Sequence, residues 1–85
     1  MYKLILKKSA IKEINCLPKK ILVSVAKVID SLALEPRPKG CIKLKGKENL
    51  WRMRVGDYRV VYNIDDKIEI IEILRVRHRK DIYNI

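Results

Sequence analysis

The chain has 85 residues, which is too few for two ordinary domains, and 48% of them are hydrophobic, which is enough for one core. No apolar run approaches the roughly 18 residues that cross a bilayer, and the N-terminus "MYKLILKKSA" lacks a signal-peptide pattern. We therefore expect a single domain over residues 1–85, soluble, cytoplasmic and without a membrane partner. Twenty Lys and Arg against ten Asp and Glu give a net charge of +10, which favours polyanions or an acidic protein as partners.

The first half of the chain predicts one strand and two helices. Residues 2–7, "YKLILK", indicate a short strand. Ser9 is a candidate N-cap for a brief helix through Ile14. A second helix is expected from Pro18 until the chain nears Pro36, because apolar residues recur there at helical spacing. These apolar positions are Ile21, Leu22, Val25, Val28, Ile29 and Leu32.

The second half predicts strands. A basic loop, "RPKGCIKLKGKEN", leads to expected strands at 50–55, 58–64 and 68–77, which the short tail "KDIYNI" follows. This order predicts an α+β fold. An N-terminal strand and two helices precede a three-strand antiparallel meander, which forms a curved sheet with the helices on one face, and the chain closes with a short C-terminal tail or helix.

The two cysteines offer no framework for a metal or a set of disulfides. Cys16 and Cys41 lack metal-ligand spacing, and two cysteines are too few for a disulfide scaffold. They are expected to be buried thiols. The chain's one histidine and its scattered carboxylates do not make a ligand set either, so we expect neither a metal nor a cofactor.

The segment "LWRMRVGDYRVVY", residues 50–62, predicts a hairpin with an unusual charge pattern. A two-residue loop with Gly56 first suits a type II′ turn and places Arg54 opposite Arg59. One face would then carry Arg52, Arg54, Arg59, Val61 and Asn63, and the other would carry Trp51, Met53, Val55, Tyr58, Val60 and Tyr62. A three-residue loop would mix arginine into the apolar face, so the sequence favours the even loop.

Arginine is concentrated in the second half, where six of the seven lie between residues 52 and 79. Its rigid fork matches phosphate geometry better than a lysine does, which indicates phosphate recognition. The alternative is a solvated sheet face that discourages aggregation. The last strand, "IEIIEILRVR", is apolar on both faces, so the side taken by its basic residues stays open. These residues are Arg75, Arg77 and, just beyond the strand, Arg79.

The order of elements, with "KLKG", "LWRMRVGDYRVVY" and "VRHRKDIY", resembles the RelE/ParE superfamily of bacterial and archaeal type II toxins. The resemblance covers nearly the whole chain as one RelE-like domain and is most specific over residues 43–83. For the RelE branch it implies a metal-independent mRNA interferase that enters the ribosomal A site. There the ribose 2′-hydroxyl attacks the adjacent phosphate and leaves a cyclic phosphate and a 5′-hydroxyl. It places Arg52, Arg54, Arg59, Arg79 and Tyr83 at the active-site positions.

The roles implied by the resemblance differ between these residues. The arginines suit stabilisation of developing phosphorane charge, and Tyr83 suits base stacking or proton transfer, or packs as part of the tail. The best-known members carry lysines where this chain has Arg52 and Arg54, and a guanidinium cannot act as a general base. His78 is a lower-ranked candidate for proton transfer. Further candidates for RNA contact are Lys43, Lys45, Lys47, Arg75, Arg77 and Lys80.

The resemblance leaves two other functions open. A ParE-like protein shares the fold and inhibits DNA gyrase by binding it, and a toxin homologue that has lost activity would act as a binding module. The expected partner is a cognate acidic antitoxin, with a disordered segment that folds across the toxin and covers or displaces its C-terminal tail. The resemblance also implies that the toxin–antitoxin complex is a higher oligomer.

Overall fold

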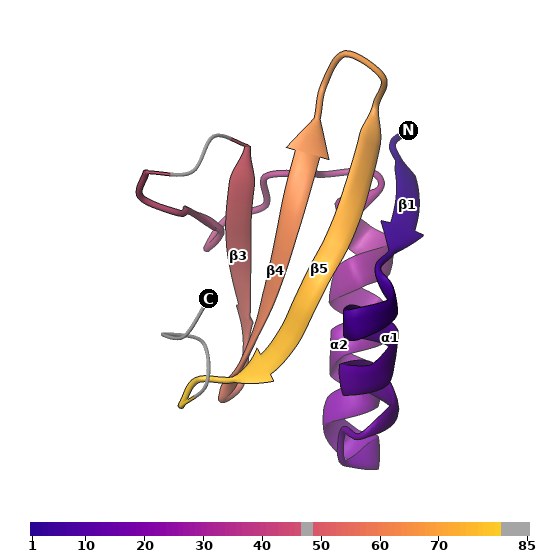
Figure 1. Cartoon of the computed structure of the whole chain (residues 1–85), viewed down its shortest axis with the longest axis vertical. Coiled ribbons are helices and arrows are strands. Elements are labelled where there is room, and N and C mark those ends of the chain that lie inside the picture. Colours follow the sequence, from indigo (N-terminus) through magenta and orange to yellow (C-terminus); the bar gives the residue numbers. More distant parts are fainter. Residues whose placement is uncertain (47–48, 81–85) are drawn as a thin grey trace.

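The computed structural model describes residues 1–46 and 49–80 and shows two helices and a five-stranded mixed sheet. In chain order the elements are β1 (Lys3–Leu6), α1 (Lys8–Asn15), α2 (Lys19–Leu32), β2 (Ile42–Lys43), β3 (Leu50–Val55), β4 (Tyr58–Asp65) and β5 (Ile70–His78). The strands lie in the order β1-β5-β4-β3-β2, and the two helices lie together beside β5 and β1 (Figure 1). The predicted α+β fold, with its antiparallel meander of β3, β4 and β5, is confirmed.

The core lies between the helices and one face of the sheet. α2 contributes the buried residues Val25, Ile29 and Leu32, which lie at the predicted helical spacing. The sheet contributes Val55, Val60, Tyr62, Ile64, Ile71, Ile73 and Val76. Burying one such aliphatic side chain is worth about 1.5–3 kcal/mol relative to leaving it exposed, so this face holds the two layers together. Within the described residues, neither helix is long and apolar enough to cross a membrane.

The first strand of the chain pairs with the last one. β1 pairs in parallel with the first half of β5, from Lys3 opposite Ile70 to Leu6 opposite Ile73. A parallel pair needs a crossover, and the two helices are part of it. Beyond Ile73 the outer edge of β5 faces α1 instead of a strand, and this edge carries polar contacts described below.

The β4–β5 ladder contains one irregularity that decides which side chains of β5 face the core. Val61 pairs with Arg75, whereas the next residue, Tyr62, pairs with Ile73. Leu74 is therefore the extra residue of a β-bulge, and it reverses the alternation of side chains along β5. Val76 and Ile73 consequently both lie in the core, although regular alternation would place residues separated by an odd number of positions on opposite faces of the sheet.

Two local predictions are wrong. Ser9 does not cap α1, because the helix begins at Lys8 and Lys7 is its N-cap residue. Its hydroxyl instead donates a hydrogen bond of 3.0 Å to the carbonyl oxygen of Leu74. Cys16 is an exposed thiol, because it is the C-cap residue of α1 where the chain leaves the helix, and Cys41 is only half-buried; both are free.

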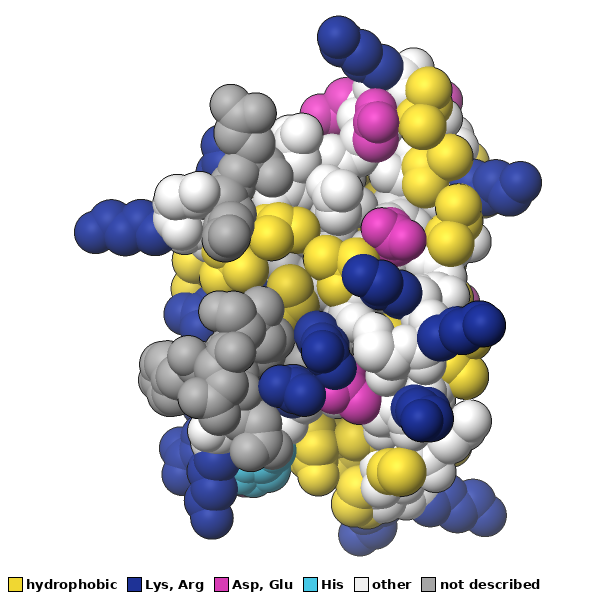
Figure 2. Space-filling view, viewed as in Figure 1, with side chains coloured by type: hydrophobic (Ala, Val, Ile, Leu, Met, Phe, Trp, Pro, Cys, Tyr) yellow, Lys and Arg dark blue, Asp and Glu magenta, His cyan; other side chains and the backbone are white. Residues whose placement is uncertain are grey.

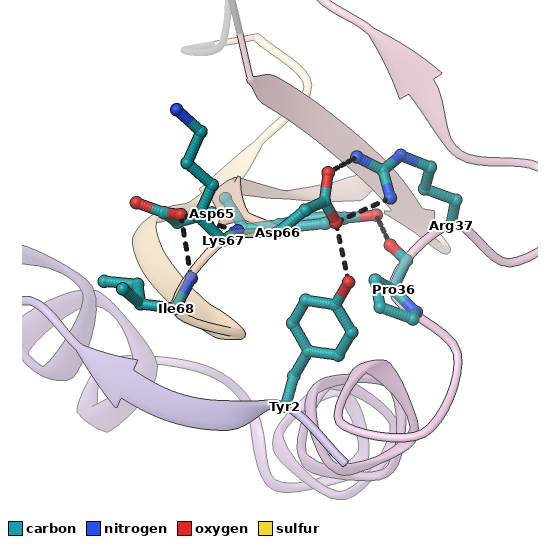
Figure 3. A network of polar contacts seen from close by, with 8 residues as sticks. Tyr2, Pro36, Arg37, Asp65, Asp66, Lys67 and Ile68 are labelled. Atoms are coloured by element: carbon teal, nitrogen blue, oxygen red, sulfur yellow. Dashed lines mark hydrogen bonds and ion pairs between the residues drawn. The ribbon is translucent and has the colours of Figure 1, made fainter.

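A polar network joins the start of the chain to the loop after α2 and to the β4–β5 turn. The Arg37 guanidinium forms two hydrogen bonds with the Asp66 carboxylate, at 2.8 and 3.2 Å, and the Tyr2 hydroxyl donates to the same carboxylate at 2.6 Å. Figure 3 shows both groups directed at Asp66. Arg37 also lies over the ring of Trp51, with 5.0 Å from Cζ to the ring centroid. This arginine therefore binds Asp66 and Trp51 at the end of the sheet opposite the β3–β4 turn.

Candidate nucleic-acid interface

The β3–β4 hairpin has the predicted even loop. Gly56 has φ +60°, which only glycine adopts readily, whereas Asp57 has no positive φ, and this combination fits a type II′ turn. Arg54 lies opposite Arg59, as the loop parity requires. Trp51 and Met53 pack against the core, so the neighbouring arginines lie on the other face of the sheet. The predicted division of the hairpin into an arginine side and an apolar side is confirmed.

The strand register extends this arrangement to β5. Arg54, Arg59 and Arg77 are consecutive cross-strand partners in one row, and Arg52, Val61 and Arg75 form the next row. Five arginines thus share the face of the sheet that the core does not use, and we call this set the arginine face: Arg52, Arg54, Arg59, Arg75 and Arg77. In the view of Figure 2, Lys and Arg side chains gather over the middle and lower part of the molecule with a carboxylate among them.

Arg79 is joined to the hairpin through its backbone. Its N–H donates a 2.7 Å hydrogen bond to the carbonyl oxygen of Asp57, which places this exposed residue beside the β3–β4 turn and therefore near Arg54 and Arg59. Lys80 follows it and is also exposed. The predicted sites at Lys47 and Tyr83 lie outside the described residues.

His78 lies on the other side of the sheet from the arginine face. It pairs with Tyr58, a residue of the apolar side, and the two rings meet edge to face with 5.2 Å between centroids. Both rings line a groove of about 570 Å³ at the end of α1, together with Lys12, Glu13, Cys16, Leu17, Val76 and Arg77. The His78 Nδ1 accepts a hydrogen bond from the Lys80 N–H at 3.3 Å.

The predicted lysines of the basic loop do not join the arginine face. Lys43 pairs with Trp51 in the short strand β2, which assigns it to the apolar side of the sheet. Lys45 is exposed in the turn that follows β2. Of the candidates for RNA contact, the structure therefore brings Arg75 and Arg77 next to the hairpin arginines and leaves these two lysines apart from them.

Glu13 contacts the arginine face, although it is not among the residues predicted from the sequence. From α1, its Oε2 accepts from Arg77 Nε at 2.6 Å and from Arg75 Nη1 at 3.3 Å. Its Oε1 accepts from the backbone N–H of Val76 at 2.9 Å. One signal was available in the sequence, since Glu13 is the only acidic residue before Asp30. Within the described residues no cluster of His, Cys, Asp and Glu side chains could hold a metal.

Two hairpin arginines of this face make local hydrogen bonds to backbone carbonyl oxygens. Arg54 Nε donates to the carbonyl oxygen of Gly56 at 3.3 Å, and Arg59 Nη1 donates to that of Tyr58 at 3.2 Å. The contact of Arg54 does not neutralise its guanidinium charge. Arg52 and Arg54 therefore present positive charge on β3, and their fork-shaped donors suit phosphate oxygens.

Residues 4–83 match the family model described as the ParE toxin of the type II toxin-antitoxin system, parDE. The chain belongs to the RelE/ParE family of type II toxins. Toxin RelG of Mycobacterium tuberculosis is 36% identical to this RelE/ParE toxin over 76 residues, which cover 88% of this chain and 87% of RelG. The putative toxin RelE1 of Methanocaldococcus jannaschii is 32% identical over 81 residues, 89% of this chain and 88% of that protein.

Solved structures of the RelE/ParE family share the fold. The RelE–RelB complex of Pyrococcus horikoshii contains a chain with a TM-score of 0.82 and 35% identity, and the match covers 92% of this chain and 94% of that one. A chain of the RelBE2 toxin–antitoxin complex of Mycobacterium tuberculosis has a TM-score of 0.78 and 32% identity, covering 92% and 98%. Each of these two neighbours belongs to a toxin–antitoxin complex.

Proposed function

We propose that this toxin is a metal-independent endoribonuclease that cuts messenger RNA in the ribosomal A site. The observation that carries the proposal is the arginine face, in which five guanidinium groups lie on three adjacent strands. The arginines of its hairpin strands suit phosphate contacts, because arginine binds phosphate with two parallel hydrogen bonds. The relatives named RelG and RelE support the interferase branch of the family.

The proposed chemistry is attack of the substrate 2′-hydroxyl on the adjacent phosphate, which breaks the bond to the 5′-oxygen of the next nucleotide. Arg52, Arg54, Arg59 and Arg79 stabilise the charge that develops on the phosphorane oxygens. None of them accepts the proton of the attacking hydroxyl, because a guanidinium stays protonated. Tyr83 stacks on a base or transfers a proton in this proposal, and the position of His78 on the other face makes it the weaker candidate for that transfer.

The cleavage is proposed to depend on the ribosome, because the arginine face supplies charge but no strong general base. Alignment of the 2′-hydroxyl with the scissile phosphate then has to come from the A site. Purified toxin should cut messenger on programmed ribosomes much faster than the same protein-free RNA. Equal rates on the two substrates would contradict this dependence.

The experiment that tests the function is expression of the toxin in cells, followed by mapping of messenger 5′ ends. Cuts within translated codons support the proposal, and the double variant Arg52→Gln/Arg54→Gln should produce none. A second candidate, inhibition of DNA gyrase, is favoured by the match to the ParE family model. DNA damage without messenger cuts would support that alternative. The absence of both effects would indicate an inactive homologue.

The proposed partner is an acidic antitoxin encoded beside the toxin. A net charge of +10 with an arginine-rich face is costly at low salt, and two relatives of known structure are bound in toxin–antitoxin complexes. We propose that an antitoxin segment folds across the toxin and that the complex assembles as a higher oligomer. Co-purification with the neighbouring gene product, with affinity measured against salt, tests this. Failure to bind, or binding that is indifferent to salt, would contradict it.

A further inference from the structure

Glu13 occupies the edge of the sheet where β1 has ended. The pairing of β1 with β5 stops at Ile73, so the backbone groups of β5 beyond that point have no strand partner on their outer side. α1 takes over this edge with two side chains one helical turn apart, Ser9 on the Leu74 carbonyl and Glu13 on the Val76 N–H. One oxygen of the Glu13 carboxylate therefore completes the edge of the sheet.

The other carboxylate oxygen holds the two arginines of β5. It lies 2.6 Å from Arg77 Nε and 3.3 Å from Arg75 Nη1, so one negative charge serves two positive ones. The Glu13 side chain is only 19% exposed, and that of Arg77 is 28% exposed, which shields the pair from solvent more than an ordinary surface ion pair. Both guanidinium groups are thereby drawn from the arginine face toward α1.

The arginine face consequently has two unequal halves. Its β5 half, Arg75 and Arg77, is partly neutralised and fixed by Glu13. Its β3 part, Arg52 and Arg54, has no carboxylate partner in the part of the chain that the structure describes. A phosphate that approaches this face meets uncompensated charge over β3 and compensated charge over β5.

We propose that Glu13 is a positioning residue that keeps Arg75 and Arg77 out of contact with the RNA and so directs the phosphate to Arg52 and Arg54 on β3. This inference rests on the proposed function in one respect, that the arginine face binds nucleic-acid phosphate. A carboxylate with only a structural role would affect stability when replaced. A positioning role instead predicts that its loss strengthens RNA binding and slows the reaction.

The test compares Glu13→Gln with Glu35→Gln. The amide at position 13 keeps an oxygen that can accept from the Val76 N–H but no longer holds two guanidinium groups by charge. Glu35 is exposed after α2, far along the chain from these contacts, and its replacement changes the net charge equally. The probe is a short single-stranded RNA, and affinity is measured by fluorescence anisotropy between about 50 and 200 mM salt.

Release of Arg75 and Arg77 should add up to two phosphate contacts. The plot of log affinity against log salt should then be steeper by about 1.4 for Glu13→Gln than for Glu35→Gln. Combining Glu13→Gln with Arg75→Gln and Arg77→Gln should abolish this difference, because the released cations are gone. Equal slopes for the two single variants, or a difference that persists in the triple variant, would overturn the inference.

Single-turnover cleavage on programmed ribosomes supplies the second measurement. For Glu13→Gln the rate at saturating toxin should fall by on the order of tenfold or more, while half-saturation occurs at a lower toxin concentration. Glu35→Gln should match the parent in both the saturating rate and the toxin concentration at half-saturation. Absence of cleavage by the parent protein would refute the proposed function, whereas the RNA-binding slopes would still decide the role of Glu13.

Discussion

Arg59 lies directly opposite two other arginines, Arg54 on β3 and Arg77 on β5. Like charges at facing positions of a sheet are destabilising. Glu13 relieves the β5 side of this row, whereas Arg54 on the β3 side has no carboxylate partner in the described chain. The fold therefore carries an electrostatic cost at the place where an anionic ligand would remove it.

Replacing Arg54 with Gln should stabilise the free protein at low salt. Removal of one of two facing positive charges should raise the free energy of unfolding by about 0.2–1 kcal/mol. The gain should shrink near 1 M salt, where charges are screened within about 3 Å. Urea unfolding at the two salt concentrations measures it. The matched variant Arg52→Gln faces Val61 and should gain less; equal gains would contradict the explanation by facing charges.

Replacing Arg79 with Lys should separate binding from chemistry. The change keeps the positive charge and removes the fork that can make two hydrogen bonds to the scissile phosphate. Affinity for programmed ribosomes should survive, and single-turnover cleavage should fall by on the order of a hundredfold or more. Lys27→Gln removes a whole charge from an exposed position of α2 and should leave the rate unchanged. Cleavage by Arg79→Lys at the parental rate would refute a catalytic role for Arg79.

Replacing Ser9 with Ala should destabilise the fold through the bulge in β5. The Ser9 hydroxyl is a hydrogen-bond donor to the Leu74 carbonyl, and this contact is partly buried. Its loss should lower the free energy of unfolding by about 0.5–1.5 kcal/mol, as measured by urea denaturation. Ser24→Ala is the control, because the exposed Ser24 hydroxyl only bonds back to Lys20 within α2. A loss no larger than that of Ser24→Ala would show that the bulge does not need Ser9.

The Asp66 network should contribute stability that disappears in acid. Hydrogen bonds from the Arg37 guanidinium, and then from the Tyr2 hydroxyl, lower the pKa of the Asp66 carboxyl below its ordinary 3.8. A lowered folded-state pKa means that the contribution is complete above the ordinary pKa and is lost as the pH falls through the lowered value.

Thermal melts between about pH 2 and pH 7 measure this contribution. Asp66→Asn should have a lower melting temperature than the parent at neutral pH, and the difference should narrow toward the acid end of the range. Asp30→Asn, at an exposed position of α2, should show no such convergence. A constant difference between Asp66→Asn and the parent across the range would contradict the linkage.

The predictable part of the fold is the part determined by local patterns. The even hairpin loop followed from the parity of arginine and apolar residues on either side of Gly56, and α2 followed from its apolar spacing. The parallel pairing of β1 with β5 could not be predicted in this way, because it joins opposite ends of the chain and leaves no local signal. The prediction that Ser9 caps α1 was wrong because the Ser9 hydroxyl bonds to β5 instead of to the backbone of its own helix.

The candidate site was predictable to the same extent. The hairpin arginines were placed on the correct face from sequence, and no parity argument could place Arg75 and Arg77. Their strand is apolar on both sides, so its hydrophobic pattern fits either register. The contact that fixes them involves Glu13, 62 and 64 positions away, and such a contact is a property of the packed molecule.

The bulge at Leu74 has a consequence for comparing members of the family by sequence. In a relative without the extra residue, regular alternation runs on from the position of Ile73, so the positions of Arg75 and Arg77 still face away from the core. We therefore expect a single-residue deletion at Leu74 to leave the face of these basic positions unchanged. An alignment that omits this gap would pair cations with core residues such as Val76 and would misjudge which members retain the arginine face.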